Sequence, residues 1–135
     1  MQSRFVDTSH LIAVFDPNDA LHASAVQFLK DRNHLVTSGL VLTEFLNTFS
    51  NGFRRVAAAV EVAKWLAHPR ILVIDLDRTL LEDAVAFYAS RPDKAWSLTD
   101  CASFLIMQDL GIRQALTADH HFVQAGFEAL LPVVK

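Results

Sequence analysis

Four acidic residues are spaced so that their side chains could act together: Asp7, Glu44, Asp100 and Asp119. Oxygen ligands without a cysteine favour Mg²⁺ or Mn²⁺ over zinc. Crowded carboxylates repel one another unless cations lie between them or their pKa values rise. A cation held in this way activates a bound water and stabilises the charges of an in-line displacement. The chemistry to expect from these acids is hydrolysis of a phosphodiester.

Each acid also has an ordinary structural explanation. Asp7 and Asp119 can cap the helices that begin at the next residue. Asp100 completes the S-x-x-D capping pattern that Ser97 begins. Glu44 can be a solvated residue on the exposed side of its helix. Motifs this short do not decide between the two interpretations, so the metal hypothesis depends on all four side chains sharing one crevice.

The elements that must position these acids alternate along the chain as short apolar strands and helices, which is typical of a parallel sheet covered on both faces. We predict a doubly wound, three-layer α/β/α fold with a short, mainly parallel sheet, and one domain over residues 1–135. Ligands of such sheets bind beyond the carboxyl ends of the strands, where the strand order reverses, and all four acids are compatible with that edge. The expected strands are 4–7, 34–37, 71–74, 114–117 and 131–134, and the expected helices are 8–15, 19–32, 41–49, 53–68, 78–90, 96–110 and 119–124.

Two of these helices carry apolar residues at helical spacing. Helix 53–68, together with Phe49 and Trp65, is also expected to contribute to self-association or to a groove for a partner, because the chain has an apolar surplus. The apolar stripe of helix 53–68 consists of Val56, Val60, Ala63 and Ala67. Helix 78–90 carries Leu80, Leu81, Ala84, Val85, Phe87 and Tyr88.

Composition limits the remaining possibilities. Hydrophobic residues make up 52% and charged residues 20% of the chain, and no apolar run approaches the length that spans a bilayer, so we expect a cytoplasmic protein. The single cysteine, Cys101, excludes an intrachain disulfide and is expected to be a core residue. The net charge of −3 becomes +1 once the four acids are set aside, so it does not exclude a nucleic-acid partner.

Several segments of the chain resemble the PIN domain family and, within it, the VapC-type toxins of bacterial toxin–antitoxin pairs. The resemblance implies a PIN-like fold and an endoribonuclease that uses Mg²⁺ or Mn²⁺ to cut structured RNA such as tRNA or rRNA. It also implies a homodimer and inhibition by a small cognate antitoxin. The segments that carry it are Asp7-Thr8-Ser9 after a strand, Thr43-Glu44 in a helix, Ser97-Leu98-Thr99-Asp100-Cys101 at a helix start, Leu116-Thr117-Ala118-Asp119-His120-His121-Phe122, and Ala125-Gly126-Phe127.

By this resemblance, Asp7 and Asp100 are the principal metal ligands, whereas Glu44 and Asp119 hold a second cation or orient the water. The neighbouring histidines 120 and 121 suit one shared metal poorly, and we expect them to be ordinary polar or substrate-facing residues. Hydrogen bonds to the carboxylates or to the phosphate are expected from Thr8, Ser9 and Thr117, and contacts with the RNA backbone from Arg54, Arg55, Arg91, Lys94 and Arg113.

Two other interpretations compete with the nuclease. Residues 71–83, ILVIDLDRTLLED, resemble the first motif of haloacid-dehalogenase-like phosphatases, with Asp75 as nucleophile and Asp77 as general acid. The motif lies too late in the chain for that family, and a capping role for Asp77 explains it better. The second is a catalytically silent module that binds RNA or protein, although four uncompensated negative charges do not help RNA binding.

Overall fold

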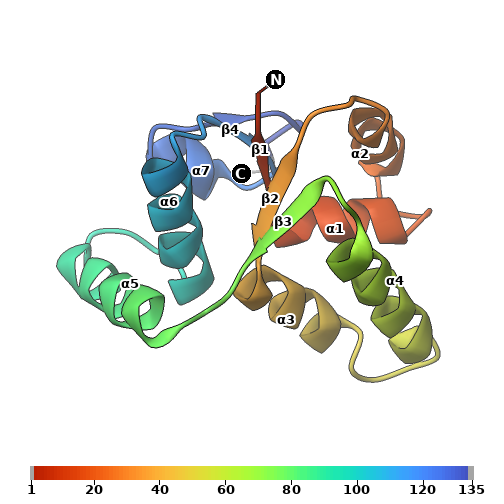
Figure 1. Ribbon diagram of the computed structural model, residues 1–135, viewed down its shortest axis with the longest axis horizontal. Coiled ribbons are helices and arrows are strands. Elements are labelled where there is room, and N and C mark those ends of the chain that lie inside the picture. The colour runs from red at the N-terminus through yellow and green to blue at the C-terminus, as the bar shows by residue number, and fades with distance from the viewer. Residues whose placement is uncertain (1, 134–135) are drawn as a thin grey trace.

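A parallel five-stranded sheet organises the computed structural model, which describes residues 2–133 (Figure 1). The strand order is β3-β2-β1-β4-β5, and every pairing among the described strands is parallel. The order reverses between β1 and β4, as the doubly wound prediction requires. The strands are β1 (Arg4–Val6), β2 (Leu35–Ser38), β3 (Ile71–Ile74), β4 (Gln114–Leu116) and β5 (Glu128–Ala129).

Helices cover both faces of the sheet, so the predicted three-layer fold is confirmed (Figure 1). The connections that lead from β1 to β3 place their helices on one face, and the connections that lead to β4 and β5 place theirs on the other. The first face carries α1 (Thr8–Phe15), α2 (His22–Leu29), α3 (Gly39–Thr48) and α4 (Arg55–Ala67), and the second carries α5 (Arg78–Ser90), α6 (Leu98–Leu110) and α7 (His120–Gln124).

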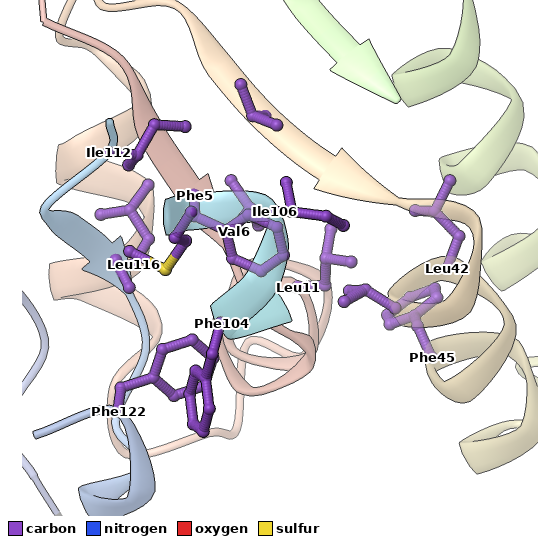
Figure 2. Close-up of a cluster of buried hydrophobic side chains, with 14 of the residues drawn as sticks. Phe5, Val6, Leu11, Leu42, Phe45, Phe104, Ile106, Ile112, Leu116 and Phe122 are labelled. Carbon is purple, nitrogen blue, oxygen red and sulfur yellow. The ribbon is translucent and has the colours of Figure 1, made fainter. Parts of the chain in front are cut away.

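The core consists of aliphatic and aromatic side chains packed on the two faces of the central strands (Figure 2). Phe104 of α6 meets Phe122 of α7 edge-on, with ring centroids 5.0 Å apart, and Phe15 meets Phe45 in the same way at 5.4 Å on the opposite face. Cys101 is buried among these residues, as predicted. Edge-to-face pairs of this kind stabilise a core beyond the area that they bury, and these two hold α6 against α7 and α1 against α3.

Helix α4 buries a different side from the one predicted. Ala58, Val62 and Trp65 face the core, whereas Val56 is 73% and Val60 50% exposed. Both sets of residues recur at helical spacing, so periodicity alone allows either side to be buried. Burial of the large indole of Trp65 decides between them. The predicted stripe of Val56, Val60, Ala63 and Ala67 is therefore an exposed apolar surface.

The last strand and the second helix also differ from their predicted bounds. Gly126, at φ +95°, turns the chain after α7 so that β5 forms at Glu128–Ala129 instead of at residues 131–134. Leu131 is buried outside any strand, and residue 134 lies outside the described residues. The predicted helix 19–32 is shortened to α2 because Asp19 Oδ1 accepts a hydrogen bond from Leu21 N, which forms a turn before the helix.

Candidate active site

The four predicted acids line a single cleft of about 430 Å³ at the carboxyl edge of the sheet. We call it the acid cleft. It lies beside the point where the strand order reverses, between the ends of β1 and β4. The metal hypothesis required all four acids to share one crevice, and they do. Its lining consists of Asp7, Thr8, Ser9, Ile12, Glu44, Ala95, Ser97, Asp100, Asp119 and His121.

Asp7 directly follows β1 and is almost completely buried. Its side chain makes no capping bond to α1, so the capping explanation fails for this residue. Instead, Oδ2 accepts hydrogen bonds from Thr117 Oγ1 at 2.9 Å and from Ser9 Oγ at 3.4 Å. Burial raises the pKa of Asp7 to about 7; the bond from Thr117 opposes this shift and the charge of Asp100 adds to it.

Asp100 fills the capping role that the sequence predicts for it. Ser97 Oγ accepts a hydrogen bond from Asp100 N, and Asp100 Oδ2 accepts one from Ser97 N, each at 3.0 Å, which completes the capping box of α6. Oδ1 accepts no hydrogen bond within residues 2–133, so one oxygen is left for a ligand. Burial raises the pKa of the Asp100 carboxyl, while the bond from Ser97 lowers it.

The imidazole of His121 joins two of the acids. Its Nδ1 lies 3.0 Å from Asp100 Oδ2 and 3.3 Å from Asp119 Oδ1. Asp119 caps α7 through a 2.9 Å bond from His121 N to Oδ1, as its capping explanation predicted. Ligand atoms of Asp119, His120 and His121 lie within 4.8 Å of one another, which corrects the expectation that adjacent histidines suit a shared cation poorly. The sequence did not show that His121 contacts these acids, because the contact depends on the direction of its ring at the start of α7.

Glu44 enters the acid cleft from the other layer of helices. Ser38 begins α3 by accepting a hydrogen bond from Val41 N at 3.1 Å, and Glu44 follows on the exposed side of that helix. The residue is therefore solvated, as its ordinary explanation required, and it also lines the acid cleft with the other three acids. It makes no ion pair with a described residue. Its carboxylate is free to turn toward a ligand in the cleft.

The hydroxyl groups of Ser9 and Thr117 form a hydrogen-bond network beside the acid cleft. Ser9 Oγ lies 3.3 Å from Thr117 Oγ1 and accepts a hydrogen bond from Ala118 N, while Thr117 Oγ1 accepts one from Asp119 N. Thr8 Oγ1 is buried with no hydrogen-bond partner in the described chain. The three hydroxyl residues predicted from the sequence, Thr8, Ser9 and Thr117, thus belong to this site. Lys94, predicted to contact the RNA backbone, lines a neighbouring cleft instead.

The donor set fits a divalent cation. No lysine or arginine within residues 2–133 forms an ion pair with any of the four acids, and the basic side chains beside them are the imidazoles of His120 and His121. Burial of unpaired carboxylates is costly, and a cation between them removes that cost. Thr8 also lines the cleft, and its hydroxyl oxygen has no hydrogen-bond partner among the described residues. An oxygen-rich site with one or two imidazoles suits Mg²⁺ or Mn²⁺.

The residues of the phosphatase motif lie elsewhere. Asp75 and Asp77 line a separate hollow together with Asp83 and Asp109, and neither lines the acid cleft. Asp77 caps α5 by accepting a hydrogen bond from Leu80 N at 2.8 Å. The capping interpretation of this motif is therefore confirmed.

Several of the predicted RNA-contacting residues already form ion pairs or hydrogen bonds within the protein. Arg54 forms an ion pair with Asp16, and Arg91 forms one with Asp93, each at 3.0 Å. Arg55 donates a hydrogen bond to the carbonyl oxygen of Ser50. Lys94 and Arg113 make no ion pair with a described residue, so their charges are the more available of the five.

A carboxylate cleft at the switch point of a parallel sheet defines an α/β protein whose acids are of the kind that hold cations in phosphoryl chemistry. The chain belongs to the PIN domain family, whose model matches residues 4–128. It is 30% identical over 132 residues to the 23S rRNA-specific endonuclease VapC20 of Mycobacterium tuberculosis, covering 95% of this chain and 98% of that protein. Across residues 2–133, no helix combines the length and apolar character needed to cross a membrane.

Solved structures show the same relationship. The crystal structure of VapC20, described as a sarcin-ricin loop cleaving toxin, superimposes with a TM-score of 0.85 at 28% identity over 95% of this chain and 98% of that one. VapBC2 from Rickettsia felis, bound to a promoter DNA fragment, gives a TM-score of 0.68 at 11% identity over 95% and 97%. FitAcB from Neisseria gonorrhoeae gives a TM-score of 0.62 at 14% identity, covering 93% of this chain and 94% of that one. At such low identity, the last two show the fold alone.

Proposed function

We propose that this protein is a metal-dependent endoribonuclease that hydrolyses phosphodiester bonds in structured RNA and acts in the cytoplasm as the toxin of a toxin–antitoxin pair. The observation that carries the proposal is the acid cleft, in which four carboxylates converge without an arginine or lysine partner among the described residues. The similarity to VapC20 along nearly the whole chain supports the same activity. Ribosomal RNA is the favoured substrate because that relative is named as specific for 23S rRNA.

In this proposal, Asp7 and Asp100 are the principal ligands of Mg²⁺ or Mn²⁺, and Glu44 and Asp119 complete the set. When bound, the cation supplies an activated water and stabilises the charge that develops on the phosphate. Thr117 holds the carboxylate of Asp7 in one orientation through its 2.9 Å hydrogen bond. Because the cleft is partly buried, its carboxylates bind a cation more strongly than exposed acids do.

We also propose that the apolar surface of α4 binds a second copy of the chain or the antitoxin. Phe53, Val56, Val60 and Leu66 all lie on or beside this helix and are at least half exposed. Several large apolar side chains exposed along one helix are typical of a surface that binds another protein.

Calorimetric titration of the full chain with Mn²⁺, together with cleavage of total RNA, tests the nuclease proposal. We expect saturable Mn²⁺ binding and RNA cleavage that a chelator abolishes, and we expect Asp100→Asn to lose both. Asp109→Asn is the matched control because Asp109 lies on the same helix but is exposed and lines another hollow. RNA binding without metal binding or cleavage would instead identify a catalytically silent module.

A further inference from the structure

A second cleft of about 820 Å³ borders the acid cleft. It lies between the carboxyl end of α5, the loop of residues 91–97 and the start of α6. Ala95 and Ser97 line both clefts, so the two share a wall. A polymer bound across the acid cleft can therefore continue directly into the second one. We call it the aromatic cleft, after Tyr88 and Trp96 in its lining.

The walls of the aromatic cleft differ sharply from those of the acid cleft. None of its lining residues is acidic, and two of them, Arg91 and Lys94, are basic. The Arg91 guanidinium lies 5.0 Å and the Lys94 ammonium 5.9 Å from the ring centroid of Trp96. Because Arg91 is paired with Asp93, the unbalanced positive charge here belongs to Lys94.

Folding does not account for the exposed ring of Tyr88. The side chain of Tyr88 is 54% exposed, and that of Val85 nearly as much. Helix α5 is held instead by Ala84, which is fully buried, and by Phe87, whose ring lies 5.9 Å from that of Trp96. The tyrosine ring is therefore left facing a cavity of a size that suits a small organic group.

We propose that the aromatic cleft is the subsite for the nucleotide next to the cleaved phosphodiester, with its base stacked on Tyr88 and its phosphate near Lys94. This inference rests on the proposed nuclease function. Aromatic rings interleaved with cations are the usual means of holding an unpaired nucleotide, because every base offers a flat face and every linkage a negative charge. The shared wall at Ala95 and Ser97 places that nucleotide adjacent to the acids.

Binding of a fluorescently labelled, unstructured RNA decamer to the full chain in chelator tests the subsite without turnover. We expect Tyr88→Ala to weaken binding about ten-fold, the typical loss for one stacked base, and Tyr88→Phe to retain it. Lys94→Gln is expected to reduce the dependence of affinity on salt concentration. Leu81→Ala is the matched control, because Leu81 is exposed on the same helix as Tyr88 but lines neither cleft.

Further measurements separate this inference from the nuclease proposal. Tyr88→Ala should bind Mn²⁺ as the unmodified protein does and should raise KM for RNA more than it lowers kcat. Unchanged affinity and KM in a variant that still cuts RNA would overturn the subsite and leave the nuclease proposal standing. A change from dimer to monomer in Tyr88→Ala, seen by sedimentation, would also overturn it and assign the cleft to a subunit interface. Failure of the unmodified protein to cut RNA with Mn²⁺ would refute the nuclease proposal first.

Discussion

Thr117 and Asp7 are 110 positions apart in the sequence, yet the threonine hydroxyl donates a 2.9 Å hydrogen bond to Oδ2 of the aspartate. The bond links the ends of β1 and β4, the two strands between which the sheet reverses its order. It fixes the orientation of the most deeply buried acid of the cleft.

Thr117→Val is expected to lower Mn²⁺ affinity by about 10- to 100-fold, the usual effect of losing a partner that orients a metal ligand. Valine has the same shape but no hydroxyl, so Asp7 loses its strongest donor. Calorimetric titration measures the change. Thr117→Ser keeps the hydroxyl and should bind Mn²⁺ nearly as the unmodified protein does; equal affinity in all three proteins would contradict the orienting role.

Asp7→Asn is expected to stabilise the metal-free protein above pH 7, raising Tm by about 5 °C. Burial raises the folded-state pKa of Asp7 to about 7, above its ordinary value of 3.8. The unfolded chain therefore releases this proton at lower pH, and the free energy of unfolding falls as pH rises from about 4 to about 7. Thermal unfolding in chelator at pH 5 and pH 8 tests this. The increase in Tm of Asp7→Asn over the unmodified protein should be small at pH 5 and complete at pH 8.

Mn²⁺ provides the complementary measurement. It should raise the Tm of the unmodified protein at pH 8, because a ligand that binds only the folded state stabilises it. It should raise the Tm of Asp7→Asn much less. Equal stabilisation of both proteins by Mn²⁺ would show that Asp7 is not a ligand.

His10 is expected to make the fold sensitive to acid. The ring is fully buried; Nε2 bonds to the carbonyl oxygen of Ala25, and Nδ1 has no partner among the described residues. Burial lowers its pKa from 6.5 to about 4. Its contribution to stability is thus complete above pH 6.5 and is lost as pH falls toward 4.

Urea unfolding of the unmodified protein and of His10→Leu between pH 4 and pH 7.5 measures this contribution. The difference between the two proteins isolates His10, because Asp7 titrates in the same window with the opposite sign in both. The unmodified protein should lose stability relative to His10→Leu as the pH falls. A pH-independent difference would contradict the prediction.

His121→Ala is expected to weaken Co²⁺ and Mn²⁺ binding more than Mg²⁺ binding, because imidazole nitrogen suits the transition metals better. The Nδ1 atom of His121 lies within reach of both Asp100 and Asp119. The visible absorption of bound Co²⁺ reports directly on nitrogen ligation, independently of activity. His34→Ala serves as the control because His34 is exposed. An unchanged Co²⁺ spectrum in His121→Ala would exclude this ring as a ligand.

Val56→Glu is expected to weaken self-association or antitoxin binding at least about ten-fold, since it places a charge in an apolar interface. Sedimentation at several concentrations measures the first effect. The free energy of unfolding should change little, because Val56 is largely exposed. Ala57→Glu, on the polar side of the same helix, should leave association unchanged. A concentration-independent monomer in the unmodified protein would contradict the dimer.

The parallel sheet and the convergence of the acids could be predicted because both follow from local patterns. Strand-ending positions such as Asp7 are visible in the sequence, and the switch point of a doubly wound sheet has a known place. The side of α4 that is buried could not be predicted, because Val56 and Trp65 mark two stripes of equal periodicity. Only the packing of the whole domain selects between them.

The part of the site that escaped prediction depends on side-chain direction. Nothing in the order of residues shows that the ring of His121 turns toward Asp100, since the two are 21 positions apart. The sequence also could not show that Lys94 lies apart from the acids, because this too depends on the direction of its side chain. Its neighbours Ala95 and Ser97 reach the acid cleft, but its own side chain lies over Trp96 in the adjoining one.

The capping box gives Asp100 a reason to persist that has nothing to do with catalysis. A descendant of this chain that had lost its chemistry would still benefit from an acid at this position, because the start of α6 depends on it. Asp7 offers no such benefit, since its buried carboxyl caps nothing and its ionisation opposes folding. In an inactive lineage, drift would therefore erase Asp7 early, and its survival in a sequence is the better marker of a working site.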